Sequence, residues 1–513
     1  MAMNDMPTDG GPFRLPLLQF LKHSRQLHQQ HVSGTLTYPV PIYVLGNTSA
    51  DLDSMISAIV YSYFASGNLR SPLSSHGRRP HIPLINLPTV PSGLELRRLR
   101  PEFVKALSLS TRLNSSTIGK DRRDGGDWSE SSKSVGTFLQ EHILTVADLT
   151  AQQAGGGHRW SLDTVMVDWN AFPSSRAADA GRVGALDSLS MVDFNVVGCI
   201  DHHVDEGFVS QTSAGRSSSS AEPVLVELGP GSCTSLVIRE LRQRGLWQGG
   251  NTAPEELHIA KLAMAPILID TNNLTYKATD TDRDSVAFLE EKIQSELQGT
   301  SSSSSWNRES FFHSVSESKQ NSLDMLTIHE ILGRDYKEWV EETAPPEAAN
   351  KQRVKIGVAC CVKPIEWIVG KARSELISKT GSKGINHDST ASDYFLDSLR
   401  SFSADHQLNV VVVMTAFTDS DNKFRRELSL WSLQAGPGEE CCKSFASHCQ
   451  SELGLVDWSS TPSSQSQQQS INNKHSIAYR FRGESLRIWE QTDLSKSRKK
   501  VAPLLRGEAA RFL

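Results

Sequence analysis

Residues 196–203 (VVGCIDHH) form a short apolar run that ends in three ionisable side chains. A buried strand that ends in this way delivers its last side chains to the carboxyl edge of a sheet, where open α/β folds bind their ligands. Asp201, His202 and His203 are all residue types that can hold a metal ion. The triplet does not decide the function by itself, because adjacent histidines also occur on exposed loops.

Three other apolar runs of the chain also end at carboxylates. Residues 41–45 (PIYVL) lead into Asn47, Asp51 and Asp53; residues 165–167 (VMV) lead into Asp168; and residues 266–269 (PILI) lead into Asp270. Four such strands side by side predict a parallel sheet whose site lies at the strand ends. Carboxylates with imidazoles suit a hard or borderline divalent cation, namely Mg²⁺, Mn²⁺ or Co²⁺. For Asp51 and Asp53 a helix N-terminus with favourable carboxylates is the alternative.

These four motifs, taken in order, resemble the DHH phosphoesterase superfamily. Within it the chain is most similar to the fungal cytosolic exopolyphosphatases, and to the related prune-type and family II inorganic pyrophosphatases. The similarity runs from about Tyr38 to the C-terminus. In the C-terminal part, residues 497–503 (SRKKVAP) are similar to the basic signature of the DHH-associated domain, and residues 355–359 (KIGVA) resemble one of its strands.

The resemblance implies an α/β protein with an N-terminal parallel-sheet DHH domain and a smaller C-terminal α/β DHH-associated domain, with the active site in the cleft between them. We expect the following division: an N-terminal extension at 1–35, the metal-binding DHH domain at 36–300, a linker at 301–320 and the substrate-binding domain at 321–513, with a disordered insert at 459–474. Other Ser-rich and Gln-rich tracts are expected to be disordered inserts, because they cannot bury enough apolar surface to offset ordering entropy.

The resemblance also implies a pair of divalent cations. One would be held by Asp51, Asp168 and Asn47, and the other by Asp53, Asp168, His202 and Asp270, with Asp168 bridging. Two such ions activate a water molecule as the nucleophile and stabilise the departing oxygen. Asp201 would orient a histidine ring, and His203 would contact phosphate and protonate the leaving oxygen.

Cations beyond the metals are needed because negative charge spreads over the transferring phosphoryl group. Arg498 and Lys499 are the implied catalytic and substrate-binding cations, and Lys319 is a further candidate. Ordinary alternatives exist for both segments: a basic run near a terminus is usually solvated, and Lys319 in residues 317–320 (ESKQ) is about as readily an exposed lysine.

The first motif departs from the pyrophosphatase pattern, which the resemblance says begins with histidine where this chain has Asn47. An amide binds a transition metal less well than imidazole does, so the first metal position should be weaker and more tolerant of Mg²⁺. This difference favours a polyphosphate enzyme over a manganese pyrophosphatase.

Residues 229–236 (GPGSCTSL) allow two interpretations. The backbone N–H groups at the start of the helix expected over 236–244 could bind phosphate. A simple Ser or Thr cap with a glycine turn is the simpler interpretation.

Periodicity predicts helices over about 15–28, 53–64 and 365–377, and strands at 354–362, 408–417, 428–433 and 477–481. The seven cysteines show no zinc-site spacing and are expected to be reduced. No signal peptide or membrane span is apparent, so a cytoplasmic protein without a membrane partner is expected. The formal net charge of -5 gives no general attraction to polyanions, so no nucleic-acid partner is expected and a phosphate-rich substrate needs a local basic cluster.

The function predicted from the sequence is release of terminal orthophosphate from inorganic polyphosphate. The alternatives are a prune-like short-chain polyphosphate or nucleotide phosphodiesterase and an inorganic pyrophosphatase. A non-catalytic scaffold is the alternative from a different class, and it would not need the complete set of carboxylates and histidines. Chain-length preference and oligomeric state are left open.

Overall fold

The computed structural model describes residues 14–513 except 37–38, 67–78, 112–132, 154–158, 173, 176–182, 210–221, 250–253, 299–305, 325, 343–352, 381–390, 420, 422, 459–476, 479 and 482–484. The expected insert at 459–474 therefore lies outside the described residues. The chain forms two compact units, unit 1 (Met1–Ser316) and unit 2 (Glu317–Leu513), each described by itself below.

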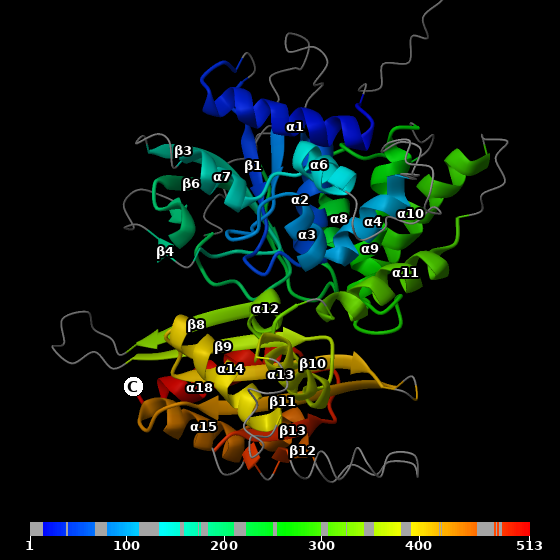
Figure 1. Cartoon of the computed structure of the whole chain (residues 1–513). Helices are drawn as coiled ribbons and strands as arrows, with labels where there is room; N and C mark the ends of the chain where they lie inside the picture. Colours follow the sequence, from blue (N-terminus) through cyan, green and yellow to red (C-terminus); the bar gives the residue numbers. More distant parts are fainter. Residues whose placement is uncertain are drawn as a thin grey trace, which may run out of the picture. The chain divides into compact units, whose positions relative to one another are not determined.

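Unit 1 is built on a seven-stranded sheet in the order β2-β1-β3-β6-β5-β4, with β7 also paired to β6 (Figure 1). Its strands are β1 (Ile42–Leu45), β2 (His81–Leu84), β3 (Trp160–Val167), β4 (Ser174–Ser175), β5 (Val183–Ala185), β6 (Val192–Asp201) and β7 (Val224–Val226). Strands β2, β1, β3, β6 and β7 run parallel, whereas β4 and β5 pair antiparallel at one edge. The predicted α/β fold with a mainly parallel sheet is confirmed.

Side chains of the central strands alternate between two hydrophobic clusters, one on each face of the sheet. In β1, Val44 packs into one cluster and Tyr43 and Leu45 into the other. This two-sided burial is characteristic of parallel strands covered by helices. The helices of unit 1 are α1 (Leu17–Val32), α2 (Leu52–Ala65), α3 (Leu94–Leu99), α4 (Pro101–Thr111), α6 (Lys133–His142), α7 (Val146–Gln153), α8 (Cys233–Gln243), α9 (Glu256–Asp270) and α10 (Asp280–Gln298).

Helix α1 lies in the segment expected to be an N-terminal extension, and it packs on the core of unit 1. Its apolar side chains Leu17, Phe20 and Leu21 are at most 2 % exposed and lie in the main core of unit 1. The sequence showed an amphipathic helix but not what its apolar face packs against, which is a tertiary property.

Helix α1 also carries a buried histidine with an acid-sensitive environment. His28 is 1 % exposed, and its ring nitrogens lie 3.0 Å from Tyr43 Oη and 2.8 Å from Gln152 Oε1. Burial lowers the pKa of His28 from 6.5 to about 4. Between pH 6.5 and 4, His28 is therefore protonated in the unfolded chain but neutral in the folded chain. The free energy of unfolding falls as the pH drops from about 6.5 towards 4.

We expect His28→Gln to lose about 2 kcal/mol less free energy of unfolding than the wild type between pH 7.5 and pH 5. Urea titrations at both pH values would measure the difference. His313→Gln is the matched control, because that side chain is 68 % exposed and contacts water before and after unfolding. Equal acid sensitivity of the wild type and His28→Gln would contradict the prediction.

The strand expected at 266–269 is helical instead. Residues 256–270 form α9, which includes Pro266 and is buried on nearly all sides from Ile259 to Leu268. A continuous apolar run fits a buried helix as well as a buried strand, and periodicity alone cannot separate the two. Three sheet strands, not four, therefore lead into the predicted ligands.

The linker expected at 301–320 is largely helical. Helix α11 (Arg308–Gln320) crosses the boundary between the units, and its side chains Phe311 and Val315 are buried in the core of unit 1. Polar residues on the other positions of this helix gave the segment its linker-like composition.

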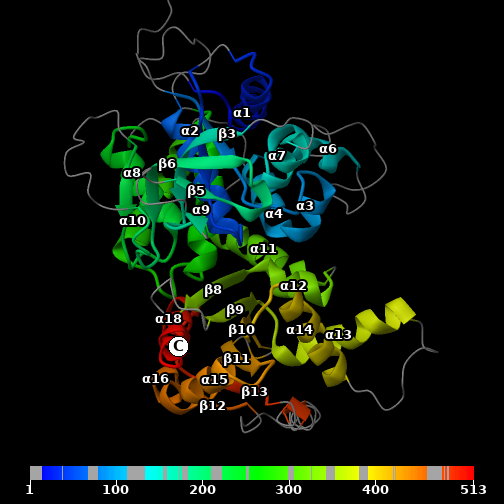
Figure 2. The same cartoon turned by 90° about the vertical axis from the view of Figure 1, so that its left-hand side faces the viewer.

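Unit 2 contains a mixed six-stranded sheet in the order β12-β13-β11-β10-β9-β8, in which only β9 and β10 are parallel neighbours. The strands are β8 (Tyr336–Glu342), β9 (Arg353–Cys361), β10 (Val410–Thr418), β11 (Phe424–Ser432), β12 (Leu455–Asp457) and β13 (Arg487–Gln491). Helices α15 (Pro437–His448) and α18 (Arg498–Ala510) cover one face, and α12 (Ile328–Arg334), α13 (Ile365–Thr380) and α14 (Ala391–Asp405) cover the other (Figure 2). The short helix α16 (Gln450–Leu453) follows α15.

The expected strand at 477–481 is wrong, because its described residues are helical. Ile477, Ala478 and Phe481 are all buried, a spacing that places them on one side of a helical turn. The other strand expectations in this unit correspond to β9, β10 and β11.

All seven cysteines are unpaired, in agreement with the expectation of reduced thiols. Within the described part of the chain, no helix is both long enough and apolar enough to cross a membrane.

Candidate metal and phosphate site

Polar side chains follow three neighbouring parallel strands of unit 1. Asn47 follows β1, Asp168 follows β3, and Asp201 is the last residue of β6. The strands are adjacent in the order β1-β3-β6, so their carboxyl ends meet at one edge of the sheet. The arrangement predicted from the strand-end motifs is present for these three residues.

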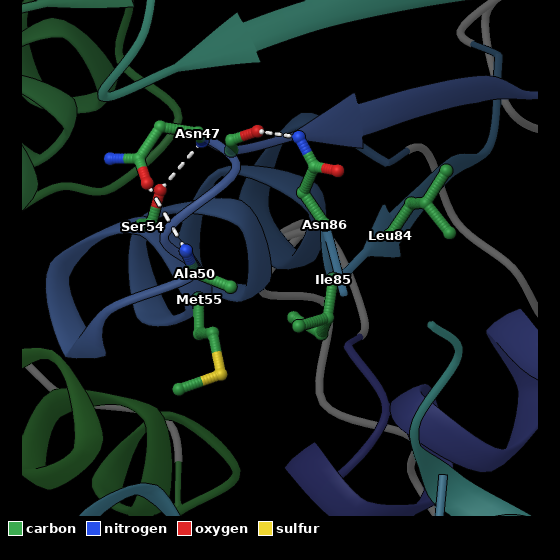
Figure 3. A pocket seen from close by; sticks show the side chains of 8 residues that line it. Asn47, Ala50, Ser54, Met55, Leu84, Ile85 and Asn86 are labelled. Atoms are coloured by element: carbon green, nitrogen blue, oxygen red, sulfur yellow. Dashed lines mark hydrogen bonds between the residues drawn. The ribbon is translucent and has the colours of Figure 1, made fainter. Parts of the chain in front are cut away.

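The Asn47 side chain holds the loop after β1 (Figure 3). Its Oδ1 accepts hydrogen bonds from Ser49 N (3.0 Å), Ser49 Oγ (2.5 Å) and Ala50 N (3.1 Å). Its Nδ2 donates to Asp168 Oδ2 at 2.8 Å. Asn47 therefore orients Asp168, and its role as a metal ligand stays a prediction.

Asp51 and Asp53 both lie at the start of helix α2, but they cap different helices. Asp51 caps α2, with its Oδ1 accepting from Ser54 N at 3.0 Å. Asp53 caps α8: its carboxylate accepts from the backbone N–H groups of Cys233 (2.6 Å) and Thr234 (3.0 Å). The second oxygen of Asp53, Oδ2, also lies 3.9 Å from His202 Nε2. Asp53 thus reaches the site from a position fixed by two helix ends.

The start of α8 is capped by protein carboxylates. Besides Asp53, the Asp282 carboxylate accepts from Gly231 N (2.8 Å), Ser232 N (3.3 Å) and Ser235 Oγ (2.7 Å). These donors are already satisfied, so the capping interpretation of residues 229–236 is favoured over phosphate binding.

Asp168, His202 and His203 form a compact cluster of potential metal ligands. One ligand atom from each lies within 4.8 Å of the others. His202 Nδ1 lies 2.9 Å from the Pro230 carbonyl, which fixes Nδ1 as the N–H donor and leaves Nε2 with a lone pair. His202 Nε2 faces Asp168 Oδ1 at 3.1 Å. Two electron-pair donors therefore face each other.

Asp168 Oδ1 is buried and accepts no well-aligned hydrogen bond from the described residues. Adjacent ligands around one ion at ~2.1 Å lie about 3 Å apart, which is close to the Asp168–His202 separation. A divalent cation would satisfy both donors at once, so the residues present fit the metal that the motifs imply. The backbone of Asp168 has a positive φ of 56°, which turns the residue sharply out of β3.

The pKa values of the two aspartates also indicate a cation next to Asp168. Burial, followed by the nearby charge of Asp51, raises the pKa of Asp168 to about 7. Burial also acts to raise the pKa of Asp201, but His203 and the other hydrogen-bonding neighbours outweigh it and leave that pKa below its ordinary value. Asp168 thus lacks a compensating positive charge that Asp201 already has.

Asp201 fixes the orientation of His203. Its Oδ1 accepts from His203 Nδ1 at 2.7 Å and from His202 N at 2.8 Å. Its Oδ2 accepts from Asn170 Nδ2 at 2.5 Å. The predicted supporting role of Asp201 agrees with this geometry. A carboxylate on Nδ1 sets the tautomer of His203, so that Nε2 is the nitrogen able to exchange a proton with a ligand.

Asn170 is a site residue that sequence reasoning missed. It is 2 % exposed, donates to the Val204 carbonyl at 2.9 Å, and accepts from Glu206 N at 2.9 Å. It therefore ties Asp201 to the loop that follows the histidines. Its position two residues after Asp168 was the only local signal available.

Asp270 is the last residue of helix α9, not the residue after a strand. The three-residue cluster of potential ligands does not include it, and the structure gives it no place in the strand-edge pattern. The four-strand argument that nominated Asp270 fails because α9 is a helix, and the ligand role of Asp270 stays a prediction.

Unit 2 carries a basic cluster around Asp335. Arg498, the first residue of α18, donates from Nη1 to the Asp335 carbonyl (3.0 Å) and places Nη2 2.8 Å from Asp335 Oδ1. Burial acts to raise the pKa of Asp335, but Arg498, Lys337 and Lys319 outweigh it and hold the pKa below its ordinary value. The structure therefore brings predicted Lys319 and Arg498 to one carboxylate and adds Lys337, while Lys499 is exposed at the next position of α18.

Comparison with known proteins gives the following similarities. Residues 315–507 match the DHHA2 domain. A protein of Schizosaccharomyces pombe named "Putative exopolyphosphatase" is 27 % identical over 504 residues, which is 96 % of this chain and 97 % of the relative. A structure titled "Crystal structure of Methanococcus jannaschii putative family II inorganic pyrophosphatase" aligns with a TM-score of 0.43 and 16 % identity, covering 91 % of this chain and 99 % of that chain.

The DHHA2 match falls on the unit that carries the basic signature, and the yeast relative is similar along nearly the entire chain. The strand-end motifs, the metal-ligand cluster and these two similarities agree. Residues 315–507 therefore form a DHHA2 domain, and the chain along nearly its whole length is similar to a hydrolase named as an exopolyphosphatase.

Proposed function

We propose that the protein is a metal-dependent exopolyphosphatase that releases terminal orthophosphate from inorganic polyphosphate. The observation that carries the proposal is the facing pair of electron-pair donors, His202 Nε2 and Asp168 Oδ1, next to the Asp201–His203 pair. The name of the yeast relative supports the choice of substrate.

The metal part of the site would use Asp168 and His202, with Asp51, Asp53 and Asp270 as the further proposed ligands. Two divalent cations, Mg²⁺ or Mn²⁺ with Co²⁺ as an alternative, would supply Lewis-acid charge and lower the pKa of a water molecule. Asn47 contributes by holding Asp168 through its Nδ2, at 2.8 Å from Oδ2. A first position with an amide in place of imidazole favours Mg²⁺ tolerance and polyphosphate over a dedicated manganese pyrophosphatase.

His203 is the proposed phosphate contact and general acid. Its Nδ1 is held by Asp201, so the ring presents Nε2 to a ligand and can deliver a proton there to the departing phosphate oxygen. The side chain is 23 % exposed, whereas Asp201 is fully buried, so a ligand can reach the ring but not the carboxylate behind it.

The basic residues of unit 2 are the proposed substrate-binding groups. Arg498 can bind phosphate oxygens through its planar fork, and Lys499 and Lys319 add point charge. Their positive charge would offset the charge of the transferring phosphoryl group and of the remaining chain.

The substrate is tested by incubating purified protein with long-chain polyphosphate, pyrophosphate or a cyclic nucleotide, each with Mg²⁺ or Mn²⁺. We expect kcat/KM for polyphosphate to exceed that for pyrophosphate by at least about tenfold, and we expect EDTA to abolish release of orthophosphate. A preference for pyrophosphate or the cyclic nucleotide would select one of the alternative enzymes. Release from none of the three substrates would leave the scaffold hypothesis.

A further inference from the structure

Asp335 lies between helix α12 and strand β8, 163 residues from Arg498 in the sequence. It contacts the Arg498 guanidinium at two points, through its backbone carbonyl (3.0 Å) and through its side-chain Oδ1 (2.8 Å). The same carbonyl also accepts from Cys360 N of β9 at 2.8 Å, so the backbone of Asp335 is itself fixed by the sheet. The guanidinium is therefore held by one residue in two ways, by a hydrogen bond to its backbone carbonyl and by an ion pair with its carboxylate.

Arg498 needs such a partner because of its place in α18. It is the first residue of the helix, Lys499 and Lys500 follow it, and the first turn contains no acidic residue. Cations at a helix N-terminus are destabilised by the macrodipole and by each other. An arginine also has about 2 kcal/mol of rotamer entropy to lose when it binds. A carboxylate that holds the side chain in advance reduces both costs.

We infer that Asp335 is a positioning residue, which holds the Arg498 guanidinium in the orientation that binds a phosphate group of the substrate. The inference rests on the proposed function of Arg498 as a phosphate ligand. Lys337 and Lys319 add positive charge near Asp335 alongside Arg498 and so offset the charge of the carboxylate.

The opposite role would be competition, with Asp335 occupying the guanidinium and excluding phosphate. The two roles predict opposite changes in kcat/KM when Asp335 is replaced. If Asp335 positions Arg498, its removal weakens substrate use; if it competes, its removal strengthens substrate use.

The test is a double-mutant cycle on the full chain, with long-chain polyphosphate as substrate and kcat/KM as the measurement. We expect Asp335→Asn to lower kcat/KM by about tenfold and Arg498→Ala to lower it by about a hundredfold. Adding Asp335→Asn to Arg498→Ala should cost nothing further, because Asp335 acts only through Arg498. Additive losses would overturn the inference, and so would a gain in the single variant Asp335→Asn.

A matched control is available at the other end of the same strand and helix. Glu341 of β8 pairs with Arg506 of α18, so Glu341→Gln breaks an equivalent link between the two elements. We expect kcat/KM to stay within about twofold of the wild type in this variant. A loss equal to that of Asp335→Asn would show that both carboxylates merely hold the fold and would overturn the inference.

The outcomes also separate this inference from the proposed function. No orthophosphate release by the wild type would refute the exopolyphosphatase proposal, and the inference with it. Release by the wild type together with unchanged kcat/KM in Asp335→Asn would refute the inference alone. Thermal unfolding of each variant shows whether the fold is retained.

Discussion

Replacing Asp168 with Asn is expected to lower kcat for polyphosphate hydrolysis by at least about 1000-fold. The substitution removes a negative charge and places an N–H₂ donor where a cation would bind. Asn suits the backbone there, because Asp168 has a φ of 56°, and asparagine tolerates the left-handed region well. The loss should therefore reflect chemistry and not misfolding. Orthophosphate release under saturating Mg²⁺ or Mn²⁺ is the measurement.

The same variant is expected to be more stable than the wild type when metal is absent. Asp168 is 2 % exposed, Asp51 and Asp53 add negative charge nearby, and no described group gives Oδ1 a well-aligned hydrogen bond. Removing that charge relieves about 1–2 kcal/mol of unfavourable burial and repulsion. Metal addition should then raise the melting temperature of the wild type but hardly that of Asp168→Asn.

Asp163→Asn is the matched control, because Asp163 lies on the same strand β3 and pairs with Arg79, with its side chain 27 % exposed. It should keep wild-type activity and its metal-dependent stabilisation. If Asp168→Asn retained activity, or if its melting temperature still rose with metal as in the wild type, Asp168 would not be a ligand.

Replacing Asp201 with Asn is the second change for which we expect a large effect, a loss in kcat of about 100-fold or more. The neutral amide can still accept from His203 Nδ1, but it no longer stabilises the charged imidazolium that a general acid requires. It also turns an N–H₂ group towards Asn170 Nδ2, so that two donors meet at a separation of 2.5 Å. Activity and stability should therefore both fall.

The double variant Asp201→Asn with Asn170→Asp separates the two effects. It exchanges donor and acceptor between the same two buried positions, so part of the lost melting temperature should return. The activity should not return, because the charge next to His203 is still absent. Recovery of full activity in the double variant would show that Asp201 serves only to hold the fold. An unchanged kcat in Asp201→Asn would contradict the role of His203 as the acid.

Local sequence patterns were sufficient for many features of this protein. Apolar alternation and a polar strand end located β1, β3 and β6, and their adjacency follows from the rules of parallel sheets. Asp168, His202 and His203 could be named as a cluster because each is tied to the end of such a strand. The helical spacing in α2 and α13 was also legible, since it depends on neighbouring residues only.

Tertiary structure decided which of several locally acceptable conformations each remaining segment adopts. Residues 266–269 are apolar enough for a strand, and only packing within the core of unit 1 makes them part of helix α9. In the same way, the apolar face of α1 shows that it must pack, but not that it packs on unit 1.

Tertiary structure also determined which partner each polar side chain contacts. Asn47 is drawn into hydrogen bonds with its own loop and with Asp168, and Asp53 caps a helix that lies 180 residues further along the chain. Arg498 meets Asp335 across 163 residues. The sequence by itself determined the strand-end motifs and the residue types of the site, because those depend on local periodicity. Which side chain each polar atom contacts was decided by the fold, because hydrogen bonds and ion pairs form between groups that only folding brings within about 3 Å.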